Sequence, residues 1–231
     1  MTWDLPPKPA EISESRLIQA ILDGKFPIDS NLLAERELAG MLGVTRPTLR
    51  ETLQRLGRDG WLEIRHGKPT RVRNYWREGN LGVLAAIAQN PGSLPADFAD
   101  NMLMIRSLLA PAYTRLAVER AANQVTEILH SLQDLEDDPQ VFTDLDWHLQ
   151  IELTVLSGNP VFTLIYNGFA GLYAALGVRY FQYPENREIS RQFYRDLLTC
   201  AQTGDGMGAE QVVRQTMLAS QELWSRVGGN G

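Results

Sequence analysis

The sequence contains one cysteine, three histidines and no long apolar run, and these shortages exclude several classes of protein. The single thiol, Cys200, cannot close an internal disulfide, and its mostly apolar surroundings in DLLTCAQ indicate a small buried side chain rather than a nucleophile. No window approaches the ~20 apolar residues that a membrane span needs. The first residues, MTWDLPPKPAEISES, lack a charged start followed by an apolar run, so we expect a cytoplasmic protein without a membrane partner.

What the sequence does contain is an uneven distribution of charge. The 231 residues carry a net charge of -6, yet residues 1–76 hold 12 basic and 10 acidic side chains, whereas residues 77–231 hold 10 and 18. This polarity predicts a basic, anion-binding module joined to an acidic body. The polar stretch NYWREGN marks the expected hinge, which gives a predicted module at residues 1–74, a linker at 75–80 and a second domain at 81–231.

Two predicted helices open the basic module. The stretch ISESRLIQAILDGKF has apolar residues at helical spacing, and we interpret Ser13 and Ser15 as caps of its helix. The stretch AERELAGML predicts a second, shorter helix with Leu38, Met41 and Leu42 on its apolar face.

A third helix follows directly in GVTRPTLRETLQRLGR. Gly43 permits a sharp turn and Thr45 is a candidate N-cap. The stripe formed by Leu49, Leu53 and Leu56 is expected to face inward, so Arg46 and Arg50 face outward near the helix N-terminus. Two helices joined by a short glycine turn predict a helix-turn-helix, whose second helix enters the DNA major groove.

The stretch GWLEIRHGKPTRVR predicts a two-stranded hairpin after these helices. Leu62 and Ile64 alternate before the turn at residues 66–67, and Thr70 and Val72 alternate after it. A basic hairpin in this position is a wing that can reach phosphates or the minor groove. For the arginines of the third helix, the alternative to DNA binding is an ordinary solvated helix face with charge pairs such as Glu51 with Arg55.

The rest of the chain predicts helices almost throughout. Apolar spacing from Leu81 to Val227 is helical, with breaks at NPGSLP, EDDPQ, SGNP, QYPEN and TGDGMG. We therefore expect six or seven helices, the longest from Asp97 to Ala122, in an antiparallel bundle that can hold a ligand between helices. The predicted fold class is an α+β N-terminal winged helix-turn-helix followed by an all-α C-terminal helical bundle.

The stretch AERELAGMLGVTRPTLRETLQRLGRDGWLEIRHGKPTRV resembles the winged-helix domain of the GntR family of bacterial transcription regulators. The resemblance implies a homodimer that binds a double-stranded DNA operator. Arginine also offers two parallel donors to guanine, which supports base recognition independently. The residues that the resemblance assigns to DNA are Arg36, Arg46 and Arg50 at base edges or backbone, Thr45 and Thr48 at phosphates, and His66 and Gly67 at the wing tip.

The helical body resembles the fatty-acid-responsive branch of the same family, through stretches such as NGFAGLYAALGVRYF, FYRDL and SQELW. In that branch the bundle binds long-chain acyl-CoA, and this effector is implied here. Taken alone, tyrosine and tryptophan at helical spacing are typical of a protein core. The ligand residues implied by position are Arg106, Tyr173, Tyr180, Tyr194, Ser220 and Trp224.

Two positions in the body bear on the effector. Arg106 lies among apolar residues, so it extends its charge to solvent, pairs with Asp100 or Asp146, or meets an anionic ligand. Met217 stands where the branch has glycine, which predicts a narrower ligand channel.

Two other functions compete with an acyl-CoA-responsive regulator. A GntR-type regulator that holds a small organic acid through a metal needs an aspartate and about three histidines. The stretch DLDWH resembles part of that pattern, but the only histidines are His66, His130 and His148. An enzyme is disfavoured because Ser220 has no histidine nearby in sequence and no glycine loop for phosphates occurs. We therefore expect no catalytic residues, no metal and no cofactor.

Overall fold

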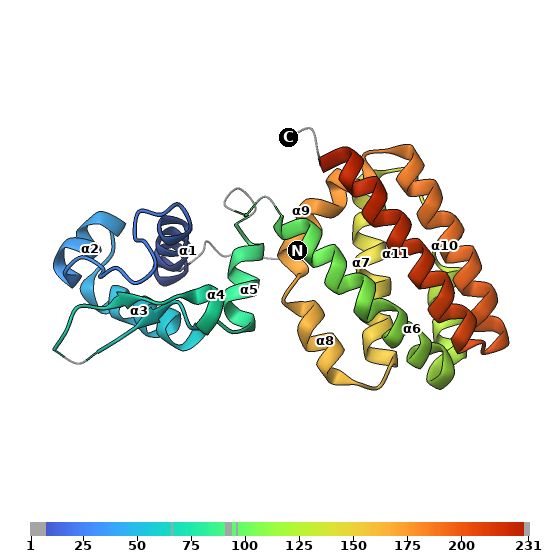
Figure 1. Ribbon diagram of the computed structural model, residues 1–231, viewed down its shortest axis with the longest axis horizontal. Helices are drawn as coiled ribbons and strands as arrows, with labels where there is room; N and C mark the ends of the chain where they lie inside the picture. The colour runs from blue at the N-terminus through green and yellow to red at the C-terminus, as the bar shows by residue number, and fades with distance from the viewer. Residues whose placement is uncertain (1–7, 66, 91–93, 96, 229–231) are drawn as a thin grey trace. The chain divides into compact units, whose positions relative to one another are not determined.

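The computed structural model describes residues 8–65, 67–90, 94–95 and 97–228, and its contacts divide the chain into two compact units, Met1–Leu94 and Pro95–Gly231 (Figure 1). The first unit extends beyond the predicted hinge because α5 (Leu81–Ala88) contacts α3 (Arg46–Asp59). The Asn80 amide also donates to the carbonyl of Arg58 at 3.4 Å. The domain limits at residues 74 and 81 stay a prediction.

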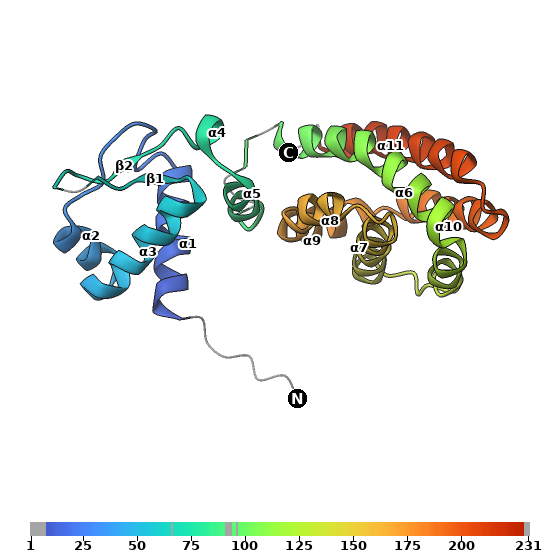
Figure 2. The same cartoon turned by 90° about the horizontal axis from the view of Figure 1, so that it is seen from below.

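The first unit has the winged helix-turn-helix fold that the sequence predicts (Figure 2). Its core gathers apolar side chains from the three first helices and the hairpin, which include Leu17, Leu38, Leu49, Leu56, Trp61 and Val72. The elements in chain order are α1 (Pro9–Leu22), α2 (Glu35–Leu42), α3, β1 (Leu62–Glu63), β2 (Arg71–Val72), α4 (Tyr75–Glu78) and α5.

The hairpin is antiparallel and pairs Leu62 with Val72. Each strand has only two residues, so the prediction that Ile64 and Thr70 lie in the strands is wrong. Strand β2 also exchanges backbone hydrogen bonds with the loop before α2, because Val72 N–H donates to the carbonyl of Ser30 at 2.8 Å. These bonds to the loop hold the hairpin against the helices although its strands are short.

Two local predictions in the first unit are wrong. Helix α1 begins at Pro9, so Ser13 is no cap: its buried hydroxyl donates to the Ala10 carbonyl and bonds the Thr52 hydroxyl of α3. Met41 is exposed, and Ala39 takes its place on the buried face of α2. Both errors arise because the packing of α1, α2 and α3 decides which side of a short helix is covered.

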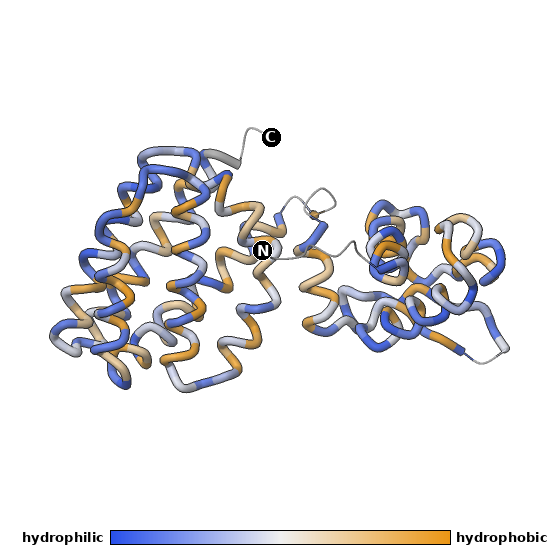
Figure 3. Tube along the Cα trace, turned by 180° about the vertical axis from the view of Figure 1, so that it is seen from behind, coloured by the Kyte–Doolittle hydropathy of each residue, from blue (hydrophilic) through white to orange (hydrophobic). Residues whose placement is uncertain are grey.

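The second unit is the predicted helical bundle, with α6, α10 and α11 side by side and α7 packed on α6 and α9 (Figure 1). Hydrophobic residues line the inner faces of these helices and polar residues their outer faces (Figure 3). In the described part of this unit the helices are α6 (Phe98–His130), α7 (Pro139–Leu156), α8 (Pro160–Asn167), α9 (Ala170–Phe181), α10 (Pro184–Thr203) and α11 (Gly206–Gly228).

The predicted breaks after α6 all separate helices, for local reasons. Proline is the first residue of α7, α8 and α10, where its missing N–H has no helical partner to lose. The Asp138 and Asn159 side chains cap α7 and α8 by accepting backbone N–H bonds. Helix α6 continues past the predicted end at Ala122 to His130, with non-helical backbone angles at Ala121.

No single helix in the described residues is long and apolar enough to cross a membrane. The bent pair of α8 and α9 reaches that length and composition only when the two are taken together.

Candidate functional site

The outer face of α3 carries two of the arginines that the sequence assigns to DNA. Arg46 and Arg50 are both exposed, one turn apart, opposite the buried leucine stripe. The Thr45 hydroxyl accepts a hydrogen bond from the Thr48 N–H at 3.3 Å, which fixes the first turn of the helix. Because backbone N–H groups at a helix N-terminus attract anions, this end of α3 suits a phosphate backbone.

The charges around these arginines are only partly neutralised. Arg50 Nε lies 2.9 Å from Glu35 Oε2 of α2, so an acid from the other helix holds its guanidinium. No acidic side chain of the described residues lies within 4 Å of Arg36 or Arg46. Of these three arginines, Arg36 and Arg46 have no acidic partner among the described residues, whereas Arg50 is already oriented by Glu35.

The wing carries less free charge than its sequence suggests. Glu63 accepts hydrogen bonds from both Arg65 and Arg71, and the bonds from Arg65 lower the pKa of the Glu63 carboxyl. Gly67 has φ +70 with open space around its Cα, so backbone conformation rather than crowding favours glycine. His66, the other predicted wing-tip residue, lies outside the described residues.

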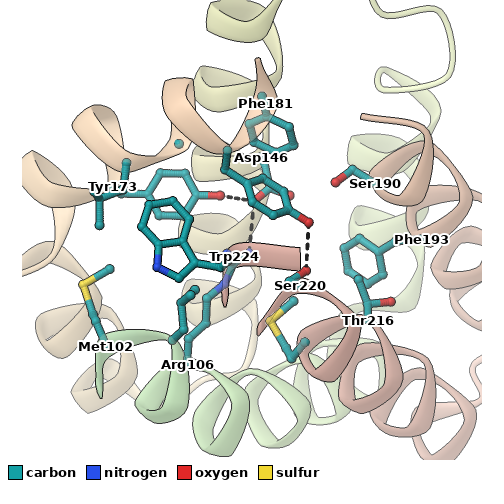
Figure 4. A pocket seen from close by; sticks show the side chains of 15 residues that line it. Met102, Arg106, Asp146, Tyr173, Phe181, Ser190, Phe193, Thr216, Ser220 and Trp224 are labelled. Carbon is teal, nitrogen blue, oxygen red and sulfur yellow. Dashed lines mark hydrogen bonds and ion pairs between the residues drawn. The ribbon is translucent and has the colours of Figure 1, made fainter. Parts of the chain in front are cut away.

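The second unit contains a cavity of about 60 Å³ that is lined by side chains of α6, α7, α9, α10 and α11 (Figure 4). Five of the six predicted ligand residues line it, although they come from three helices: Arg106, Tyr173, Tyr180, Ser220 and Trp224. The apolar part of its wall includes Met102, Phe181, Phe193 and Met217. Of these four, the sequence predicted a role at the ligand only for Met217.

Asp146 of α7 is the polar centre of this cavity. Arg106 pairs with it at 3.0 Å, which is the ion pair that the sequence offered as one of three alternatives for Arg106. The Tyr173 hydroxyl donates to Oδ2 of the same carboxylate. Asp146 is 3% exposed, and a buried carboxylate is stable only when hydrogen bonds satisfy its oxygens.

Tyr194 is the predicted ligand residue that does not line the cavity. It is buried behind Asp146, and its hydroxyl donates to Oδ1 at 2.9 Å. Burial and the adjacent Asp146 carboxylate raise the pKa of Tyr194 well above its ordinary value, so its hydroxyl stays protonated as a donor. From this position Tyr194 stabilises the cavity wall through Asp146 and does not line the cavity itself.

Tyr180 and Ser220 meet on the opposite side of the cavity, where the Tyr180 hydroxyl donates to Ser220 Oγ at 3.2 Å. A polar rim, an apolar wall and a buried ion pair together suit an amphipathic ligand. The cavity has room for only a few water molecules, because each needs ~10–15 Å³. A long chain enters only when side chains move, and Met102 and Met217 are the flexible ones.

The described residues contain no group of three His, Cys, Asp or Glu side chains that could hold a metal ion. Cys200 is half-buried, and burial raises the pKa of its thiol, which keeps it protonated and a poor nucleophile.

Comparison with known proteins agrees with both units. Residues 11–72 match the family of bacterial regulatory proteins of the gntR type, and residues 73–230 match the FadR C-terminal domain. A Shewanella sp. (strain MR-4) protein named fatty acid metabolism regulator protein is 41% identical over 217 residues, which cover 94% of this chain and 90% of the relative. The protein of the same name from Cronobacter sakazakii is 40% identical over 222 residues, 96% and 93% of the two chains.

The fold has a counterpart among solved structures. One is titled as Lar, which controls expression of the Listeria monocytogenes agr system; it covers 96% of this chain and 99% of its own, with a TM-score of 0.62 and 14% identity. At this identity the likeness concerns the fold alone.

A winged helix followed by a FadR-type helical domain defines a transcription regulator rather than an enzyme. The chain belongs to the GntR family of such regulators and, by its C-terminal domain, to the fatty acid metabolism regulators of the FadR type.

Proposed function

We propose that the protein binds operator DNA as a cytoplasmic homodimer and leaves it when a long-chain acyl-CoA occupies the cavity of the helical unit. The observation that carries this proposal is the cavity itself, which gathers five of the six residues assigned to the effector beside a buried ion pair. The relatives named fatty acid metabolism regulators support the same effector class.

The cavity geometry suggests how occupancy acts on the protein. A chain longer than the present space has to displace the side chains of α6, α9 and α11 that enclose it. Helix α6 packs on α11 and α7, and α7 packs on α9, so a shift of one wall changes the packing of the unit. The ligand favours whichever arrangement accommodates it, and by reciprocity operator DNA weakens ligand binding by the same factor.

Release of DNA by a series of acyl-CoA molecules tests the proposal. Oleoyl-CoA and palmitoyl-CoA are expected to release a fluorescent operator duplex, measured by anisotropy, whereas oleate and CoA added together release far less. Shortening the chain by four methylenes removes about 3 kcal/mol of apolar burial, roughly two orders of magnitude in effector concentration.

Calorimetric titration of the protein alone provides the control for that experiment. If no acyl-CoA binds below high micromolar concentration while operator binding persists, the effector assignment fails and a small organic acid takes its place.

Homodimerisation is tested separately, by sedimentation with a labelled duplex. A single winged helix offers few base contacts, so two copies on a pseudo-palindromic site are expected. Two chains per duplex at saturation, each of 25.9 kDa, is the expected stoichiometry. One chain per duplex contradicts it.

A further inference from the structure

Arg179 lies on the last turn of α9, next in the chain to a residue that lines the cavity. The next residue, Tyr180, lines the cavity and bonds Ser220 of α11. The guanidinium carbon of Arg179 lies over the indole of Trp224 of α11, 5.6 Å from the ring centroid. Trp224 is 6% exposed and also lines the cavity, so its indole lies between the cavity and the Arg179 guanidinium.

The charge of Arg179 is not neutralised by the described residues. Arg179 is exposed, and no acidic side chain described lies within 4 Å of it. Four other arginines of the bundle that are not buried have acidic partners: Arg115 pairs with Glu119 and Glu210, Arg191 with Asp137, Arg195 with Glu188, and Arg214 with Glu210. An arginine held over an aromatic face without an acidic partner keeps its N–H groups available to an anion.

We propose that Arg179 binds a phosphate of the effector where its polar end leaves the cavity. The inference rests on the proposed function, because it takes the cavity to hold the acyl chain. Guanidinium matches phosphate oxygens with paired, charge-assisted hydrogen bonds. The stacked indole restricts the guanidinium, which lowers the entropy lost when the phosphate binds.

Three ligands that share one chain separate the contributions. Palmitoyl-CoA carries phosphates, palmitoyl-N-acetylcysteamine is a neutral thioester, and palmitate carries only a carboxylate. Calorimetry on Arg179→Ala is expected to show about 10-fold weaker palmitoyl-CoA binding than the unaltered protein, with no change for the neutral thioester. Arg179→Lys is expected to recover part of the loss, and added salt should weaken palmitoyl-CoA binding less in Arg179→Ala than in the unaltered protein.

Arg195→Ala is the matched control, since it removes a surface arginine from α10 that pairs with Glu188 at 3.0 Å. It is expected to leave all three affinities unchanged. If Arg179→Ala binds palmitoyl-CoA as the control does, or weakens the neutral thioester or palmitate equally, the assignment of Arg179 to phosphate is overturned. If the unaltered protein binds no palmitoyl-CoA, the proposed function itself fails.

Discussion

Replacing Asp146 with alanine is expected to destabilise the helical unit by about 3–5 kcal/mol, because it leaves the Arg106 guanidinium buried without its counterion. The hydroxyls of Tyr173 and Tyr194 lose the same acceptor. Hydrogen exchange of amides in α6, α7 and α10 measures the loss within this unit, because exchange reports local stability amide by amide.

Asp144→Ala is the control, because Asp144 is an exposed carboxylate on the same helix whose side chain accepts a hydrogen bond from Gln140. It should change stability little. The double variant Arg106→Met, Asp146→Leu should recover much of the loss, since removing both charges removes the burial penalty as well as the attraction. Equal stability of the Asp146→Ala and Asp144→Ala variants would show that the pair contributes nothing.

Arg50→Ala is expected to cost about 1–3 kcal/mol of discrimination between operator and random duplex, because it removes a side chain able to make two bonds to one guanine. The fold should be unaffected, since Arg50 is exposed and Glu35 is its one acidic partner among the described residues. The affinities for operator and random duplex, measured at a single salt concentration, give the ratio that reports discrimination. Arg55→Ala is the matched control on the same helix, where Arg55 pairs with Glu51 and Glu14.

The Glu35 partner sharpens this experiment. Glu35→Gln removes a negative charge beside Arg50 while keeping the size of the side chain, so random-duplex affinity should rise and discrimination should fall. The salt dependence of binding should have a log-log slope of about -0.9 per phosphate neutralised. A flat salt response, or an unchanged ratio in Arg50→Ala, refutes the proposed interface on α3.

Local signals predicted most of the fold. Gly43 and Thr45 mark the turn into α3 because a positive φ and an N-cap are properties of single residues, and the structure has both there. Proline likewise marks the starts of three bundle helices. The length of the strands was overestimated, because β2 pairs with β1 over only two residues and also bonds the distant loop at Ser30.

The candidate effector residues could be predicted only from a family resemblance, because nothing local distinguishes them from a core. Tyr173 and Tyr194 are 27 and 48 residues from Asp146, so their convergence on one carboxylate leaves no pattern in the sequence. Tyr194 illustrates the limit: the resemblance assigns it to the ligand, whereas its hydroxyl lies behind the cavity wall. Asp146 itself was one of two acids available to Arg106, and only packing selects it.

The sequence by itself determined the order of the two units, the class of fold, the helix boundaries at proline and glycine, and the local excess of arginine, because each depends on residues close together in the chain. Only the tertiary structure decided which charges stay free. Arg50 meets an acid from another helix, Arg65 and Arg71 share Glu63, and Arg179 meets an indole. Charge pairing acts over a few ångströms in space, and the folded chain brings those partners together from positions that sequence spacing leaves unrelated.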